Sequence, residues 1–141
     1  MIATGVSVFD STVQTTNIRL DDLMQKLDWS DRHRAYAALR SVLHALRDRL
    51  PTDEVAQFSA QLPMLVRGFF YEGWHPSGKP LSGRTKGEFV AHVARDFNRV
   101  DNADPEEIVR AVFDVIARHV TPGESRALKH CLPSEIRELW T

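Results

Sequence analysis

The sequence predicts an all-α fold of about eight helices, built as two tandem four-helix repeats that are offset by 70 residues and packed as one bundle. Apolar residues recur at positions i, i+3, i+4 and i+7, which is the spacing of one helix face. The peptide pattern of "QLPMLVRGFF" at 61–70 returns as "CLPSEIRELW" at 131–140. No segment alternates apolar and polar residues over a length that would favour a strand.

A length of 141 residues fits a single domain with a sizeable core. We expect one helical domain over 1–141, with repeat one at about 15–71, a connecting loop at 72–84 and repeat two at about 85–141. The residues before repeat one are expected to be extended or to pack Val6, Val8 and Phe9 onto the bundle.

The first two helices of each repeat are predicted from matching apolar faces. The first face is formed by Leu20, Leu23, Met24 and Leu27, aligned with Val90, Val93, Ala94 and Phe97. The second, longer face is formed by Leu39, Val42, Leu43, Leu46 and Leu50, aligned with Val109, Val112, Phe113, Ile116 and Val120. Amphipathic helices of this length are marginal alone, so we expect the faces to be buried against one another.

The third and fourth helices of each repeat are short and are separated by a proline. The third helix carries Val55, Phe58 and Leu62, aligned with Ser125, Leu128 and Leu132. The fourth carries Val66, Phe69 and Phe70, aligned with Ile136, Leu139 and Trp140. Proline disfavours helix in the preceding residue and starts a new helix well, so Pro63 and Pro133 predict corners.

Three helix starts carry capping residues. Thr85, Asp104 and Thr121 are each followed three positions later by a glutamate. In this pattern the side-chain oxygen of the cap and the glutamate carboxylate accept from amides that would otherwise lack partners. We therefore expect helices to begin directly after these three residues.

Charged residues are also duplicated between the repeats. Arg67 aligns with Arg137, and Glu54 aligns with Glu124. Because both repeats keep them, we interpret them as architecture, with each arginine bridging to a glutamate or capping helix carbonyls. A paired anion site is the alternative.

The second helix of repeat one carries a basic stripe that repeat two lacks. His33, Arg40, His44 and Arg47 share one side of this helix and border its apolar face. The stripe could contact phosphates or another anionic ligand. Alternatively, it is a solvated flank whose arginine stems cover apolar surface. A net charge of −1 and the lack of a helix-turn-helix or aromatic-basic signature argue against a nucleic-acid partner.

The connecting loop is the second candidate surface. A long loop in a compact domain is often functional or mobile, and this one contains Trp74, His75, Lys79 and Arg84. Exposed aromatic side chains beside cations are typical of recognition patches. Alternatively, Trp74 folds back over the seam between the repeats.

No pattern in the sequence predicts a catalytic or cofactor site. None of the six histidines forms an i, i+4 pair, and Cys131 has no CxxC partner. His130 and Cys131 are adjacent on a helix, so their side chains diverge. We therefore expect no catalytic residue, no metal and no cofactor, and we interpret Cys131 as a partly buried structural thiol.

The segments "DRHRAYAALRSVLHALRDRLP", "AQLPMLVRGFFYEGWHPSGKP" and "LPSEIRELW" together resemble the DUF2267 family of prokaryotic proteins. The likeness extends from Phe9 to Trp140 and includes both LP corners and the "EGW" entry to the loop. The resemblance implies an all-helical fold and a bacterial cytosolic setting. It supplies no activity, cofactor or functional residue.

Composition and topology signals favour the cytoplasm. The first residues lack the basic and apolar regions of a signal peptide, and no apolar run reaches the length of a membrane span. A lone cysteine suits a reducing compartment. The expected function is a protein-interaction, scaffold or regulatory module that binds a protein partner or itself. The alternative is a small-molecule or anionic-ligand protein with a pocket between the repeats, and an enzyme is the least favoured class.

Overall fold

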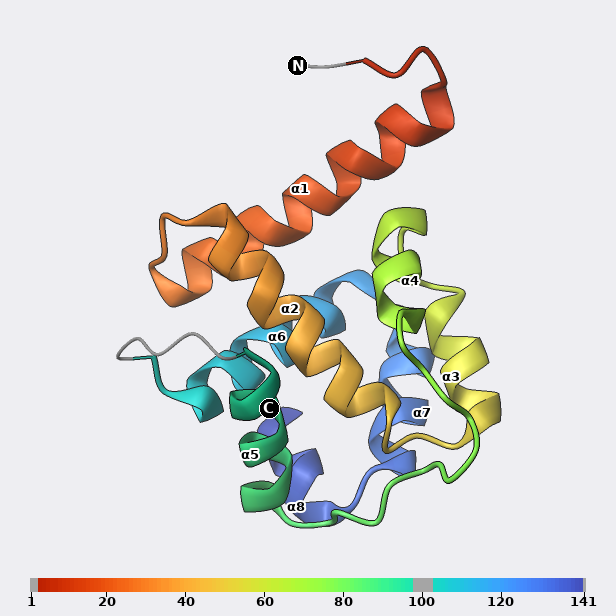
Figure 1. Cartoon of the computed structure of the whole chain (residues 1–141), viewed down its shortest axis with the longest axis vertical. Coiled ribbons are helices and arrows are strands. Elements are labelled where there is room, and N and C mark those ends of the chain that lie inside the picture. Colours follow the sequence, from red (N-terminus) through yellow and green to blue (C-terminus); the bar gives the residue numbers. More distant parts are fainter. Residues whose placement is uncertain (1–2, 98–102, 141) are drawn as a thin grey trace.

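The computed structural model describes residues 3–97 and 103–140, and this part of the chain is helical without any strand (Figure 1). The prediction of an all-α fold is confirmed. The elements are α1 (Ser7–Leu27), α2 (Arg32–Arg47), α3 (Thr52–Ser59), α4 (Met64–Tyr71), α5 (Lys86–Phe97), α6 (Pro105–His119), α7 (Pro122–Cys131) and α8 (Ser134–Arg137), followed by a 3₁₀ turn, Glu138–Trp140. None of these helices combines the length and the apolar character needed to cross a bilayer.

Helix α2 lies at the centre of the fold and packs against α1, α4, α5 and α6. Its predicted apolar face is buried, and so is the corresponding face of α6. Val42 and Val112, which the 70-residue offset aligns, are both fully buried. The two long apolar faces predicted from the sequence therefore form the core.

The predicted helix starts are found in the structure. The hydroxyl of Thr85 accepts from the amide of Glu88 at 3.1 Å, and the carboxylate of Glu88 accepts from the amide of Thr85 at 3.3 Å. Asp104 caps α6 by accepting from the amide of Glu106 at 3.0 Å. Pro63 and Pro133 directly precede α4 and α8, so both LP sequences are corners.

Arg67 and Arg137 make matching hydrogen bonds in the two halves. Arg67 donates to the carbonyl oxygens of Ser59 and Leu62, at 2.9 and 3.0 Å. Arg137 donates to those of Lys129 and Leu132, both at 2.9 Å. Each arginine thus caps the C-terminal end of α3 or α7, as the capping interpretation predicted. The matched contacts are those that a repeat would produce, but the packing of the halves as copies of one fold stays a prediction.

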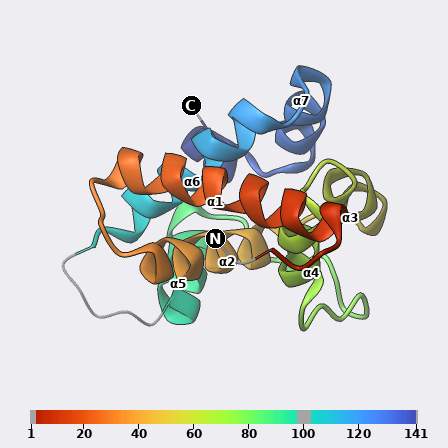
Figure 2. The ribbon, with the colours of Figure 1, turned by 90° about the horizontal axis from the view of Figure 1, so that it is seen from above.

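Helix α1 begins earlier than the sequence suggested. It starts at Ser7, directly after Val6, so the chain from Ser7 onward is helical and not extended. Val6, Val8 and Phe9 are exposed, so they are not packed onto the bundle either. The start is stabilised locally, because the amide and the hydroxyl of Thr4 both donate to the carboxylate of Asp10, at 2.8 and 3.0 Å. The two views of the ribbon show the N-terminal half of α1 standing over α4 (Figures 1 and 2).

Candidate functional site: a cleft between α1, α2 and α4

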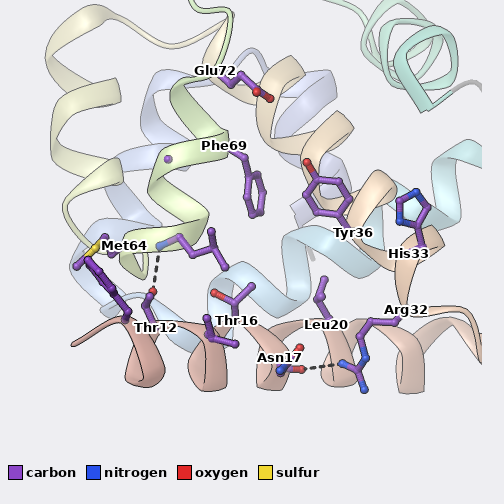
Figure 3. A pocket seen from close by; sticks show the side chains of 14 residues that line it. Thr12, Thr16, Asn17, Leu20, Arg32, His33, Tyr36, Met64, Phe69 and Glu72 are labelled. Atoms are coloured by element: carbon purple, nitrogen blue, oxygen red, sulfur yellow. Dashed lines mark hydrogen bonds between the residues drawn. The ribbon is translucent and has the colours of Figure 1, made fainter. Parts of the chain in front are cut away.

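An open cleft of about 910 Å³ separates the N-terminal half of α1 from α2 and α4 (Figure 3). We call it the α1 cleft. Its walls are mainly apolar and are formed by Phe9, Val13, Thr16 and Leu20 of α1, Tyr36 of α2, and Met64, Leu65 and Phe69 of α4. Its size lies within the range typical of ligand sites.

The wall formed by α1 is one continuous helix face. Its residues follow one another at spacings of four and three, the pattern of a helix that packs along another helix: Phe9, Val13, Thr16, Leu20, Leu23 and Leu27. Leu20 and Leu23 are 7% and 0% exposed because the core covers them. Phe9 and Val13 are 48% and 44% exposed on the same face. The face is therefore covered at one end and bare at the other.

The opposite walls combine aromatic and flexible apolar side chains. The rings of Tyr36 and Phe69 meet edge to face with centroids 5.2 Å apart, which fixes their orientation. Met64 and Leu65 at the start of α4 are exposed. Aromatic residues and methionine are enriched in the buried centres of protein interfaces.

Thr16 is an unusual polar group in the α1 cleft. The residue is 6% exposed, and its hydroxyl has no hydrogen-bond partner among the described residues. By contrast, the hydroxyl of Thr12, one turn earlier, accepts from the amide of Leu65 at 2.9 Å, a bond drawn in Figure 3. A buried polar group without a partner costs about 1–3 kcal/mol, so a polar atom of an occupant would gain by meeting Thr16.

The charged side chains at the rim of the α1 cleft are paired within the chain. Arg32 forms an ion pair with Asp21 at 2.8 Å, and Glu72 forms one with Arg40 at 2.9 Å. His33 is exposed at the rim beside Tyr36. With these pairs made, the site is suited to apolar recognition more than to ionic recognition.

The basic stripe predicted on α2 meets the C-terminal end of α4. Arg47 donates to the carbonyl oxygens of Phe70 and Glu72, at 2.8 and 3.0 Å. His44 Nε2 lies 2.6 Å from the carbonyl oxygen of Phe69. The last carbonyls of a helix have no partners within it, so these two side chains act as a cap. Both are buried and offer no surface, which corrects the expectation of a solvated or phosphate-binding stripe for them.

Burial also changes the protonation of His44. It lowers the pKa of the imidazole, and the nearby guanidinium groups of Arg47 and Arg40 lower it further, against the opposing effect of the bond to Phe69. A neutral imidazole with its proton on Nε2 can donate to the carbonyl. His44 is therefore a neutral capping group in the folded chain.

The loop candidates lie outside the α1 cleft. Trp74 is half-buried and packs on Tyr71, with ring centroids 5.7 Å apart, so the ring folds back onto the chain. Lys79 is half-buried, whereas His75 and Arg84 are exposed. None of the four lines the cleft, and their predicted role as a recognition surface stays a prediction.

The loop itself is attached to α2 and α5. The amide of Leu81 donates to the carbonyl oxygen of Asp48 at 2.7 Å. The guanidinium of Arg49 donates to the carbonyl oxygen of Gly83 at 3.1 Å and lies 2.8 Å from Nδ1 of His92. Its central carbon also sits 5.2 Å from the ring centre of Phe89. Arg49 therefore holds the loop against the body.

Other places in the described residues offer less. Between the predicted repeats, two openings of about 450 and 440 Å³ lie between the end of α1 and α6. A third, lined by Leu39, Leu43, Val115 and Ile116 among others, has a volume of about 30 Å³. That is room for about one water molecule. Within residues 3–97 and 103–140, no three histidine, cysteine or acidic side chains come together as a metal site.

A model of one protein family, described as "Uncharacterized conserved protein (DUF2267)", matches residues 16–139. A comparison with curated proteins found no match. The part of α1 from Ser7 to Thr15, which carries Phe9 and Val13, lies outside the matched range. The family comparison therefore concerns the helical body and does not address the bare end of the α1 cleft. Since the match spans most of the chain, this protein belongs to the DUF2267 family.

Proposed function

We propose that this protein is an interaction module whose α1 cleft receives an amphipathic helix of a partner protein. The observation that carries the proposal is the uncovered half of the α1 face. Phe9 and Val13 continue the face that the core covers at Leu20, yet no segment among the described residues packs over them. Exposed apolar surface with such regular spacing is typical of interaction sites.

A helix is the occupant that this spacing favours. The covered part of α1 packs against α2 and α6 through side chains at spacings of three and four. A helix laid on the bare part would present its own side chains at the same spacing. Arg32 and Glu72 at the rim are already paired with other residues of the chain. We therefore expect the partner helix to place aliphatic or aromatic side chains in the cleft and to have a polar opposite face.

The alternative is a small apolar molecule in the same cleft. The orphan hydroxyl of Thr16 favours it, because one polar atom of a ligand would complete the site. A pocket between the repeats, the place first expected, stays an alternative, because two openings of about 450 and 440 Å³ with charged linings lie between the end of α1 and α6. An anionic ligand is less suited to the α1 cleft, where Arg32 is already paired with Asp21.

The setting is also part of this proposal. We place the protein in the bacterial cytosol, the setting that the family resemblance implies, because a single cysteine suits a reducing compartment. The partner is a protein, and neither nucleic acid nor membrane is proposed. Binding to a second copy of this chain is the competing possibility, and the experiment must distinguish it from binding to a different protein.

Site-specific crosslinking tests the proposal. A photo-crosslinking phenylalanine analogue is placed at position 13 in the full chain, and in a matched variant at position 18. Ile18 is 46% exposed, close to the 44% of Val13, but it lies on the outer face of α1 away from the cleft. Crosslinks are formed in the cells that produce these variants and are mapped by mass spectrometry. The partner segment that crosslinks to position 13 is then synthesised as a peptide.

The peptide's affinity is then measured by fluorescence anisotropy. We expect position 13 to capture a segment with helical apolar spacing, Val13→Asp to weaken binding by about tenfold or more, and Ile18→Asp to change it by less than about twofold. Equal capture at both positions would refute the proposal. So would capture of a second copy of this chain, or a co-purified apolar molecule that Val13→Asp releases.

A further inference from the structure

Two glutamates meet where α3 packs against α7. Glu54 and Glu124 are each the third residue of their helix, and they are 7% and 8% exposed. Their carboxyl groups lie close enough to each other for a hydrogen bond between them. A carboxylate has no proton to donate, so such a bond requires one of the two groups to be protonated.

The position of Glu124 follows from an incomplete capping box. The hydroxyl of Thr121 accepts from the amide of Glu124 at 3.1 Å, which is one half of the box. In the other half, the glutamate would accept from the amide of Thr121. Here that amide donates to Oε1 of Gln61 at 2.9 Å, and Nε2 of Gln61 donates to the hydroxyl of Thr121 at 3.2 Å. Gln61 thus replaces Glu124, whose carboxyl group faces Glu54 instead.

Glu54 lacks the same bond for a different reason. The residue that precedes α3 is Pro51, which has no amide proton to donate. Neither glutamate therefore caps its own helix through the usual bond. Oε1 of Glu54 and Oε2 of Glu124 have no hydrogen-bond partner among the described residues.

Among the described residues, no cation contributes to the shifted pKa of Glu54. Arg67 on α4 and Arg137 on α8 donate to backbone carbonyls at the C-terminal ends of α3 and α7. Cys131 on α7 lies close enough that burial and then the two carboxylates raise the pKa of its thiol. Two buried carboxylates beside a thiol cannot all be ionised at low cost.

We propose that Glu54 and Glu124 share one proton in the folded protein, and that loss of this proton loosens the contact between α3 and α7. The pair is a pH-sensitive junction built into the fold. Its contribution to stability is present in acid and declines as the pH rises through neutrality towards about 8. This inference does not depend on what the α1 cleft binds.

The direction of the effect follows from linkage. Burial, the hydrogen bond to Glu124 and the charge of Glu124 raise the pKa of Glu54 to about 8. In an unfolded chain a glutamate has a pKa of about 4.3. The contribution of the pair to stability is therefore complete below the unfolded value and is lost as the pH rises towards 8 and beyond.

Infrared spectroscopy and urea unfolding test the junction in full-length protein carrying Cys131→Ala, which removes the titration of the thiol. The variants are Glu54→Gln, Glu124→Gln and the control Glu107→Gln, which changes an exposed glutamate in the first turn of α6. We expect the parent to show an infrared band of a protonated carboxyl group at about pH 7, and this band should disappear by about pH 9. Glu54→Gln and Glu124→Gln should both abolish the band, whereas the control Glu107→Gln should keep it.

The urea midpoint of the parent is expected to fall between about pH 6 and pH 9, with a clearly smaller fall in Glu54→Gln and Glu124→Gln. The absence of a protonated-carboxyl band in the parent at about pH 7 would overturn the proposal, even if both glutamine variants failed to fold. A band equally strong in Glu54→Gln would overturn it as well.

Discussion

Arg47 on α2 donates from Nη1 to the carbonyl oxygen of Phe70 on α4, at a distance of 2.8 Å. The same nitrogen donates to the carbonyl oxygen of Glu72 at 3.0 Å, so one buried cation satisfies two carbonyls at the end of α4. The carbonyl oxygen of Phe69, one residue earlier, pairs with Nε2 of His44. Because α2 and α4 both line the α1 cleft opposite α1, these bonds hold those two walls together as well as capping the end of a helix.

Replacing Arg47 with methionine tests this cap. The change keeps an apolar stem but leaves the carbonyls of Phe70 and Glu72 without a partner. We expect the free energy of unfolding to fall by about 1.5–3 kcal/mol, the range for hydrogen bonds to a charged group. Urea unfolding measures it. The control is Arg84→Met on the exposed part of the loop, with an expected change below about 0.5 kcal/mol. Equal losses in both variants would contradict the cap.

His44 predicts a loss of stability in acid. Burial lowers its pKa, so the folded protein resists protonation, whereas the unfolded chain takes up a proton below about pH 6.5. The contribution of His44 is therefore complete above about pH 6.5 and is lost as the pH falls below that value. In His44→Gln, which can keep a donor to Phe69, the free energy of unfolding should fall less between about pH 7 and pH 5.

The control for this pH dependence is His75→Gln, which changes an exposed histidine of the loop. It should keep the acid dependence of the parent, as followed by urea unfolding at each pH. If His44→Gln and the parent lost stability in parallel as the pH fell, the buried imidazole would not be the cause.

Local sequence patterns were sufficient for the helices and for their ends, except the start of α1. The apolar faces around Val42 and Val112, the caps at Thr85 and Asp104, and the corner at Pro63 all depend on residues within a few positions of each other. Helical spacing, capping chemistry and the geometry of proline act over such distances. For this reason the all-α fold could be predicted from the sequence.

The candidate site depends on contacts between distant segments, which the sequence did not reveal. The stripe with His44 and Arg47 borders an apolar face, and a solvated flank would show the same pattern; only the docking of α4 makes it a buried cap. The early start of α1 had a usable signal. The apolar pattern of α1 extends back from Leu20 at helical spacings, through Thr16 and Val13 to Phe9. Thr16 interrupts this pattern with a polar residue, and the residues between these positions are largely polar, so the pattern was not recognised.

Trp140 should be a main anchor of the C-terminal end. Its ring lies 4.3 Å from that of Phe113, and Nε1 donates to the hydroxyl of Ser125 at 3.1 Å. Trp140→Ala is expected to lower the free energy of unfolding by about 3–5 kcal/mol, as large core truncations do. Trp74→Ala, at a half-buried ring on the loop, should cost clearly less. Urea melts with the opposite order would show that the loop supports the fold more than this end does.

Thr16 and Thr12 provide the most direct test of the polar chemistry in the α1 cleft. Valine has nearly the shape of threonine and a similar rotamer preference in helices, so each substitution removes mainly a hydroxyl. Thr16→Val deletes a hydroxyl without a partner, and we expect the free energy of unfolding to stay constant or to rise by up to about 1 kcal/mol. Thr12→Val removes the acceptor of the Leu65 amide and should lower it by about 1 kcal/mol. Urea unfolding compares the two, and an equal loss in both would mean that Thr16 is already satisfied in the free protein.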